Sequence, residues 1–134
     1  MLNEQGSGYD LSGLDARIAQ MQERERALAG EVEAELRTYC GRDPSPGSSV
    51  YTNLLAVRAG IITNPGLMRD MEIKGVPAED PSQAAVSVAI GGRAPVVREA
   101  EHAPEAFCLA TRDALRAVNE ERRQERASRE PPAY

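Results

Sequence analysis

The sequence has 134 residues, of which 28% are charged, with one Phe, four Tyr and no Trp. A chain of this length holds about one domain with one modest core. With so few aromatic residues, the core must be built from Leu, Ile, Val, Met and Ala, whose side chains each bury less area than an aromatic ring. We expect pairing with a second copy to offset this shortage.

The 16 basic and 21 acidic residues give a formal net charge of −5 at pH 7. Affinity for nucleic acid depends on neutralising phosphates, so this balance argues against nucleic acid as a direct ligand. No apolar run approaches the roughly 20 residues that span a bilayer, and residues 1–10 lack the features of a signal peptide. We therefore expect an intracellular, cytoplasmic protein without membrane contact, or a virion component if the source is viral.

The first part of the chain predicts a flexible arm followed by a long helix. Residues 1–10 carry Gly6, Ser7 and Gly8 among polar neighbours, which is typical of a mobile arm. From residue 11 onward, apolar residues recur at spacings of three and four, which predicts one coiled-coil-like helix over residues 11–40 that ends at Gly41. The apolar stripe of this helix consists of Leu11, Leu14, Ile18, Met21, Leu28, Val32 and Leu36.

Charged residues flank this narrow stripe, a pattern typical of a helix that packs against another helix. We therefore predict that the seven stripe residues form the interface of a homodimer. Packing of the stripe on the second half of the same chain is the alternative. Glu25 within the stripe and Gly30 in mid-helix weaken the heptad pattern, because a buried charge and a helical Gly each cost stability.

The segment that follows contains strong turn signals. Residues 42–49, RDPSPGSS, predict a loop, after which Ser48 or Ser49 is expected to cap a short helix over residues 50–59 that Gly60 ends. Asn64-Pro65 marks either a helix start with Pro at its first position or a turn before a strand. The ambiguous stretch from residue 67 to 76, LMRDMEIKGV, is predicted as a strand.

The strongest strand signal is AAVSVAI at residues 84–90, where large apolar residues alternate with small ones. Gly91-Gly92 and the returning APVVREA then predict a β-hairpin. Because Pro95 has no amide hydrogen to donate, the second strand is expected to lie at an edge of the sheet or to start after Pro95. We expect a three-stranded antiparallel sheet over residues 68–99. Together with the flanking helices, this sheet predicts an α+β fold.

A C-terminal helix is predicted to begin at Pro104. Its expected inner face consists of Phe107, Thr111, Ala114, Leu115 and Val118. Residues 11–118 would then form one α+β domain, and residues 119–134 a charged helical extension and tail. Residues 1–40 contain four Arg and eight acids, a net −4, whereas residues 112–130 contain six Arg and five acids, a net +1. An acidic first helix would therefore meet the last helix of its own or a second chain favourably.

Catalytic groups are sparse. His102, the one histidine, precedes the predicted C-terminal helix, where a turn or capping role is typical, and Cys108 is expected to be a buried structural thiol. Cys40, at the end of the first helix, is the better candidate for a reactive thiol. Gly91-Gly92 lacks the Lys and the following helix of a phosphate-binding loop, and two distant cysteines with one histidine do not make a zinc set. We therefore predict a protein that is not an enzyme and needs no cofactor or metal.

The last four residues, Pro131-Pro132-Ala133-Tyr134, match the pattern PPxY. This tail resembles the ligand peptides of WW domains and the late-domain motifs by which some viral proteins recruit ubiquitin ligases. The resemblance implies that Pro131 and Pro132 preset a polyproline II backbone and that Tyr134 fills a neighbouring pocket. The alternative interpretation is the frayed end of a helix.

These observations favour a non-enzymatic interaction or assembly function. The specific prediction is a homodimeric accessory subunit, with a viral or phage particle as a candidate setting and other proteins as partners. Two alternatives remain: an adaptor that recruits a WW-domain partner through Pro131, Pro132 and Tyr134, and a small thiol-dependent enzyme that uses Cys40 or His102.

Overall fold

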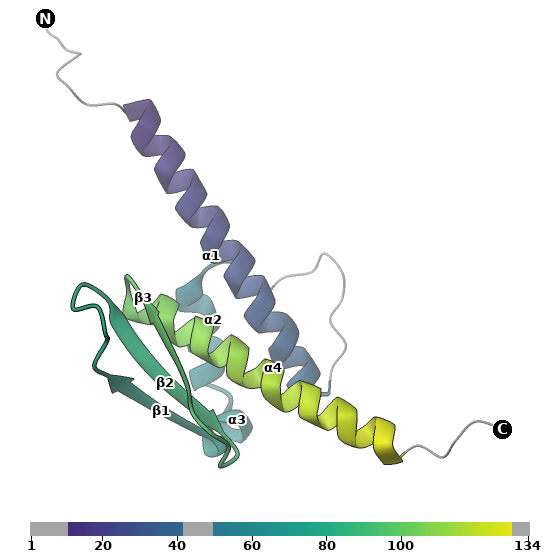
Figure 1. Cartoon of the computed structure of the whole chain (residues 1–134). Helices are drawn as coiled ribbons and strands as arrows, with labels where there is room; N and C mark the ends of the chain where they lie inside the picture. The colour runs from purple at the N-terminus through teal and green to yellow at the C-terminus, as the bar shows by residue number, and fades with distance from the viewer. Residues whose placement is uncertain (1–10, 42–49, 130–134) are drawn as a thin grey trace, which may run out of the picture.

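The structure, a computed structural model, describes residues 11–41 and 50–129. Its elements in chain order are α1 (Leu11–Tyr39), α2 (Leu54–Ile62), α3 (Pro65–Asp70), β1 (Met71–Val76), β2 (Ala84–Ile90), β3 (Val96–Ala100) and α4 (Ala103–Arg129). The predicted α+β class is confirmed: a long first helix, a three-stranded antiparallel sheet and a C-terminal helix are all present (Figure 1).

The sheet has the order β1-β2-β3, with antiparallel pairing throughout. Met71 pairs with Ile90 and Val88 pairs with Val96. Because side chains alternate between the two faces of a strand, Val86, Val88 and Ile90 share one face, and all three are buried. Gly91 and Gly92 have φ angles of +62° and +74°, so the predicted Gly-Gly hairpin turn is confirmed.

Helix α4 lies between the sheet and α1. It contacts β2 and β3 on one side and α1 and α2 on the other, an arrangement that Figure 1 shows as helix upon helix upon sheet. The predicted inner face of α4 is buried at every position, namely Phe107, Thr111, Ala114, Leu115 and Val118. Beyond Asn119 every described residue of α4 is exposed, as expected for the charged extension.

Helices α1 and α4 run side by side in the same direction. Three ion pairs connect them, Arg24–Glu105 at 3.2 Å, Glu31–Arg112 at 2.8 Å and Glu35–Arg116 at 3.2 Å. Each pair joins residues 81 positions apart, and such a constant offset requires the two helices to run in the same direction. The predicted attraction between the first and last helices is therefore realised within the chain. Solvent-accessible pairs of this kind contribute little stability each, but together they fix the register of the two helices.

The C-terminal end of α1 is also held by α4. Asn119 Nδ2 donates to the backbone oxygen of Glu35 at 3.0 Å, and Arg122 Nη1 donates to that of Tyr39 at 3.1 Å. The Tyr39 carbonyl is one that the last turn of the helix leaves without an intrahelical partner, and Asn119 adds a second bond to the carbonyl of Glu35 one turn earlier. The helix ends before Gly41, whose φ of +79° suits a glycine at this position, so the predicted helix end is confirmed.

Two predicted elements are corrected by the structure. Helix α2 begins at Leu54 rather than at residue 50, because the side chain of Asn53 accepts the Ala56 amide hydrogen at 2.9 Å and caps the helix. The predicted caps Ser48 and Ser49 lie outside the described residues. The predicted strand over residues 67–76 is correct only from residue 71.

Residues 65–70 form helix α3 instead of the predicted strand. The Asn64 side chain accepts the Leu67 amide hydrogen at 3.1 Å, and Pro65 occupies the first turn. Of the two alternatives for Asn64-Pro65, the helix start is therefore correct.

Gly60 lies inside α2, not at its end as predicted. A Cβ atom built on Gly60 would lie 2.2 Å from the hydroxyl oxygen of Tyr51 and within 2.7 Å of the ring. The ring of Tyr51 therefore covers the helix at this point, and only a residue without a side chain fits beneath it. Tertiary packing accounts for this glycine, so α2 continues to Ile62.

Replacement of Gly60 by Ala is expected to lower the free energy of unfolding by about 1–3 kcal/mol, because the ring of Tyr51 must move away from the added methyl group. Gly30→Ala in α1 is the matched control, since nothing outside the neighbouring backbone of its own helix lies within 4 Å of a Cβ there. This control is expected to raise the free energy of unfolding by up to about 1 kcal/mol. Urea denaturation followed by circular dichroism measures both, and equal stabilisation by the two substitutions would contradict the close packing of Tyr51 on Gly60.

Candidate interaction surface on the first helix

The environment of α1 changes half-way along the helix. Every side chain from residue 14 to residue 27 is exposed, whereas Leu28, Ala29 and Val32 are buried. Helix α4 begins at Ala103, and its first turn meets α1 at Arg24. Figure 1 shows the N-terminal half of α1 extending well beyond the sheet and α4. We call residues 11–23, which precede the first ion pair with α4, the protruding segment.

The protruding segment carries an apolar stripe. Leu14, Ile18 and Met21 are 50%, 44% and 54% exposed. Their spacings of four and three residues place them on one side of the helix, so they form a single patch and are not scattered surface residues. Continued along α1 at the same spacing, this stripe leads to Leu28 and Val32.

The predicted dimer interface is divided between two environments. Leu28, Val32 and Leu36 are 7%, 0% and 7% exposed and lie in the core of their own chain, where α4 and α2 cover this side of α1. The alternative of packing on the second half of the same chain therefore describes these three residues. The side chains of Leu14, Ile18 and Met21 are accessible. Leu11 is the first residue of α1, and its side chain is not among those that the structure describes.

A cavity of about 300 Å³ lies at the base of the protruding segment. Its apolar part includes Met21, Leu54 and Leu55, and Leu55 is 65% exposed. His102 also lines it, and the backbone oxygen of His102 accepts the Ala106 amide hydrogen at 3.1 Å, which fits the predicted capping role. The stripe meets this cavity at Met21, where α1 leaves the rest of the molecule, and four charged side chains also line the cavity, namely Arg24, Glu25, Glu101 and Glu105.

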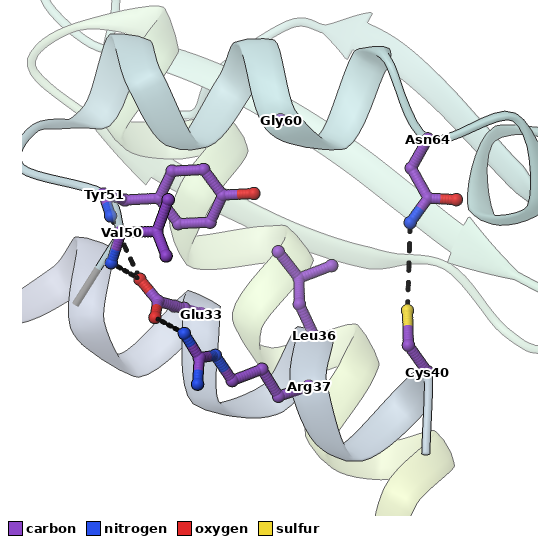
Figure 2. Close-up of a pocket in the computed structure, with 8 residues that line it drawn as sticks. All are labelled: Glu33, Leu36, Arg37, Cys40, Val50, Tyr51, Gly60 and Asn64. Carbon is purple, nitrogen blue, oxygen red and sulfur yellow. Dashed lines mark hydrogen bonds and ion pairs between the residues drawn. The ribbon is translucent and has the colours of Figure 1, made fainter. Parts of the chain in front are cut away.

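A second cavity, of about 540 Å³, lies between the C-terminal half of α1 and α2 (Figure 2). Its wall contains Glu33, which is only 5% exposed. The Glu33 carboxylate accepts the amide hydrogens of Val50 at 2.9 Å and Tyr51 at 3.1 Å, and it pairs with Arg37 at 2.8 Å. These bonds to the buried carboxylate anchor the returning chain to α1, so Glu33 has a structural function here.

Cys40 lines the same cavity with an exposed thiol, and Asn64 Nδ2 lies 3.8 Å from its sulfur (Figure 2). The described lining of this cavity contains no histidine, since His102 lines the cavity at the base of the protruding segment. Cys40 and His102, which the sequence offers as alternative residues for a thiol-dependent enzyme, therefore line different cavities. Among the described neighbours, the group on the Cys40 sulfur is an amide, which is not a base at neutral pH.

Cys108 is fully buried, as predicted for a structural thiol, and its sulfur lies 4.0 Å from the Leu54 backbone oxygen. Burial raises the pKa of the Cys108 thiol to about 12. Because the nucleophilic form of cysteine is the thiolate, this residue is inert in the folded protein at neutral pH.

No protein-family model, curated protein or solved structure matches this chain. Within residues 11–41 and 50–129, no group of three or more His, Cys, Asp or Glu side chains is placed to hold a metal ion. The helices of this described part include none that is long and apolar enough to cross a membrane. The PPxY tail, residues 131–134, lies outside the described residues, and so does the predicted arm, residues 1–10.

Thiol chemistry provides a direct check of these environments. In the native protein we expect Ellman's reagent to modify Cys40 slowly, as it does an unactivated thiol, and to leave Cys108 unmodified. A Cys40→Ser variant should then release no chromophore until denaturant is added. Rapid and selective reaction of Cys40 at neutral pH would instead favour the thiol-enzyme alternative.

Proposed function

We propose that this protein is a non-enzymatic assembly protein that self-associates as a homodimer through the protruding segment of α1. The observation that carries this proposal is the stripe formed by Leu14, Ile18 and Met21. These three large apolar side chains are about half exposed, and the part of the chain that the structure describes provides no cover for them. An exposed stripe with this spacing is the pattern by which helices recognise other helices.

The size of the stripe indicates the strength of the association. Burying the exposed half of one such side chain contributes about 1 kcal/mol, so six side chains from two copies contribute about 6 kcal/mol. Association costs about 4–15 kcal/mol in lost translational and rotational freedom. At the low end of this cost the stripe leaves about 2 kcal/mol in favour of association, so these six side chains alone support at most a weak dimer. Such an interface suits an accessory subunit that is held within a larger assembly, for which a viral or phage particle remains a candidate setting.

Charge supports pairing with a second copy. Residues 14–27 contain three arginines, Arg17, Arg24 and Arg26, and three acids, Asp15, Glu23 and Glu25, so three minus three gives a net charge of zero. The whole chain has a net charge of −5. The exposed stretch from residue 14 to residue 27 is thus neutral, and the protruding segment itself, with Arg17 against Asp15 and Glu23, has a net charge of −1, so the repulsion between two copies is small.

Light scattering coupled to size exclusion, over a range of protein concentrations, tests the proposal. We expect the mass of the unmodified protein to rise from that of one chain towards that of two. Ile18→Asp should keep the protein monomeric at every concentration, because it places a charge within the stripe. The matched control is Ala16→Asp, which adds the same charge on the opposite, exposed side of α1 and should associate as the unmodified protein does.

Both variants should retain the far-ultraviolet spectrum and thermal midpoint of the unmodified protein at low concentration, since both positions are exposed. A protein that remains monomeric at all accessible concentrations would refute the proposal. Equal loss of association in the Ile18 and Ala16 variants would show that the stripe is not the interface.

A further inference from the structure

We infer that the two copies pair with their α1 helices antiparallel, so that the protruding segment of each copy ends next to the base of the protruding segment of the other copy. This inference depends on the proposed function and adds to it the geometry of the dimer and a second contact surface on α2. It follows from where α4 begins and from the length of helix that α4 leaves uncovered.

A parallel arrangement conflicts with the position of α4. Helix α4 first meets α1 at Arg24, and the stripe side of α1 is covered from Leu28 onward, where Leu28 and Val32 are buried. If the two α1 helices ran parallel and touched at Met21, the α4 helices of both copies would have to fit between them within the next two turns. Packed helix axes lie about 8–10 Å apart, so α1 and its copy would have to separate by about 20 Å over that short distance. A straight helix cannot diverge so sharply.

An antiparallel arrangement has the length that the protruding segment provides. Thirteen residues, 11–23, span about 20 Å of helix before α4 begins. Two such segments overlap over their whole length when they run in opposite directions. An overlap centred at residue 16 places Leu14 of one copy beside Ile18 of the other, and by symmetry Ile18 of the first beside Leu14 of the second. The remaining domain of each copy then lies beyond the tip of the other's helix, where the two domains do not collide.

The cavity at the base of the protruding segment gives this arrangement its second contact. In the antiparallel pair, the N-terminal end of each α1 arrives at the level of Met21 and Arg24 of the other copy. Leu55 of α2 lines the cavity there and is 65% exposed. The end of the incoming helix would cover Leu55 and extend the apolar contact from α1 to α2.

The exposed thiol of Cys40 provides a site for a spin label, because Cys108 is fully buried. Cys40 lies 24 residues from the centre of the overlap, or about 36 Å along the helix direction. Pulsed dipolar spectroscopy on the labelled full chain, at a concentration where scattering shows dimers, should give a distance of about 70 Å between the two labels. A parallel pair would place both labels at the same end, under about 45 Å apart. Cys40→Ser carried through the same labelling is the background control.

The outcomes separate this inference from the proposed function. A long distance supports the antiparallel pair. A short distance in a dimeric sample overturns the antiparallel pair and leaves the assembly proposal in place. A sample that gives no intermolecular distance, and the mass of one chain at every concentration, refutes both.

A pair of substitutions on α2 tests the second contact. Leu55→Ala should raise the dimer dissociation constant several-fold, because it removes the apolar surface that the incoming helix covers. Ile62→Ala is the matched control, since Ile62 is also exposed, at 48%, but lies at the other end of α2 outside this cavity. If Leu55→Ala leaves the dissociation constant unchanged, or Ile62→Ala raises it equally, the contact at the base is overturned.

Discussion

The parallel pairing of α1 with α4 at a constant offset of 81 residues determines the rest of this molecule. The sheet positions α4 through the buried side chains of β2. The ion pairs between the two helices, from Arg24–Glu105 at one end to Glu35–Arg116 at the other, fix where α4 begins along α1. Because α4 starts at the level of Arg24, α4 does not cover the first 13 residues of α1, and only Met21 among the accessible stripe residues lines a cavity with α2. The accessible stripe is thus a consequence of how two long helices are staggered.

The periodicity of the sequence predicts α1 and its apolar stripe, because spacings of three and four residues are a local property of the chain. Periodicity cannot show where along α1 the partner helix begins, so it assigned Leu14 and Leu28 to the same interface. A further signal was present in the charges. Glu31 and Glu35 on α1 have the same spacing as Arg112 and Arg116 on α4, and this match between distant segments predicts an intrachain pair.

The two differences in the middle of the chain have separate physical causes. Gly60 is a helix-ending residue by local preference, but the ring of Tyr51 lies against it and the helix continues. That contact is tertiary and leaves no local trace in the sequence. The boundary between α3 and β1 was obscured for a different reason, since Met71 fits both a helix and a strand pattern. Where a signal was purely local, as in the Gly91-Gly92 turn, the prediction was correct.

The arrangement of chemical groups also bears on function. Cys40 lies at the C-terminal end of α1. His102 lines a different cavity, together with Glu25, and Glu25 precedes Cys40 by fifteen residues along α1. Fifteen residues of helix correspond to about 22 Å, far beyond the roughly 3 Å at which a base activates a nucleophile. The apolar residues have the opposite arrangement, since Leu14, Ile18 and Met21 are gathered on one side of one segment. The fold therefore holds Cys40 and His102 apart and gathers three accessible apolar side chains on one segment of α1, which is the feature that the assembly proposal uses.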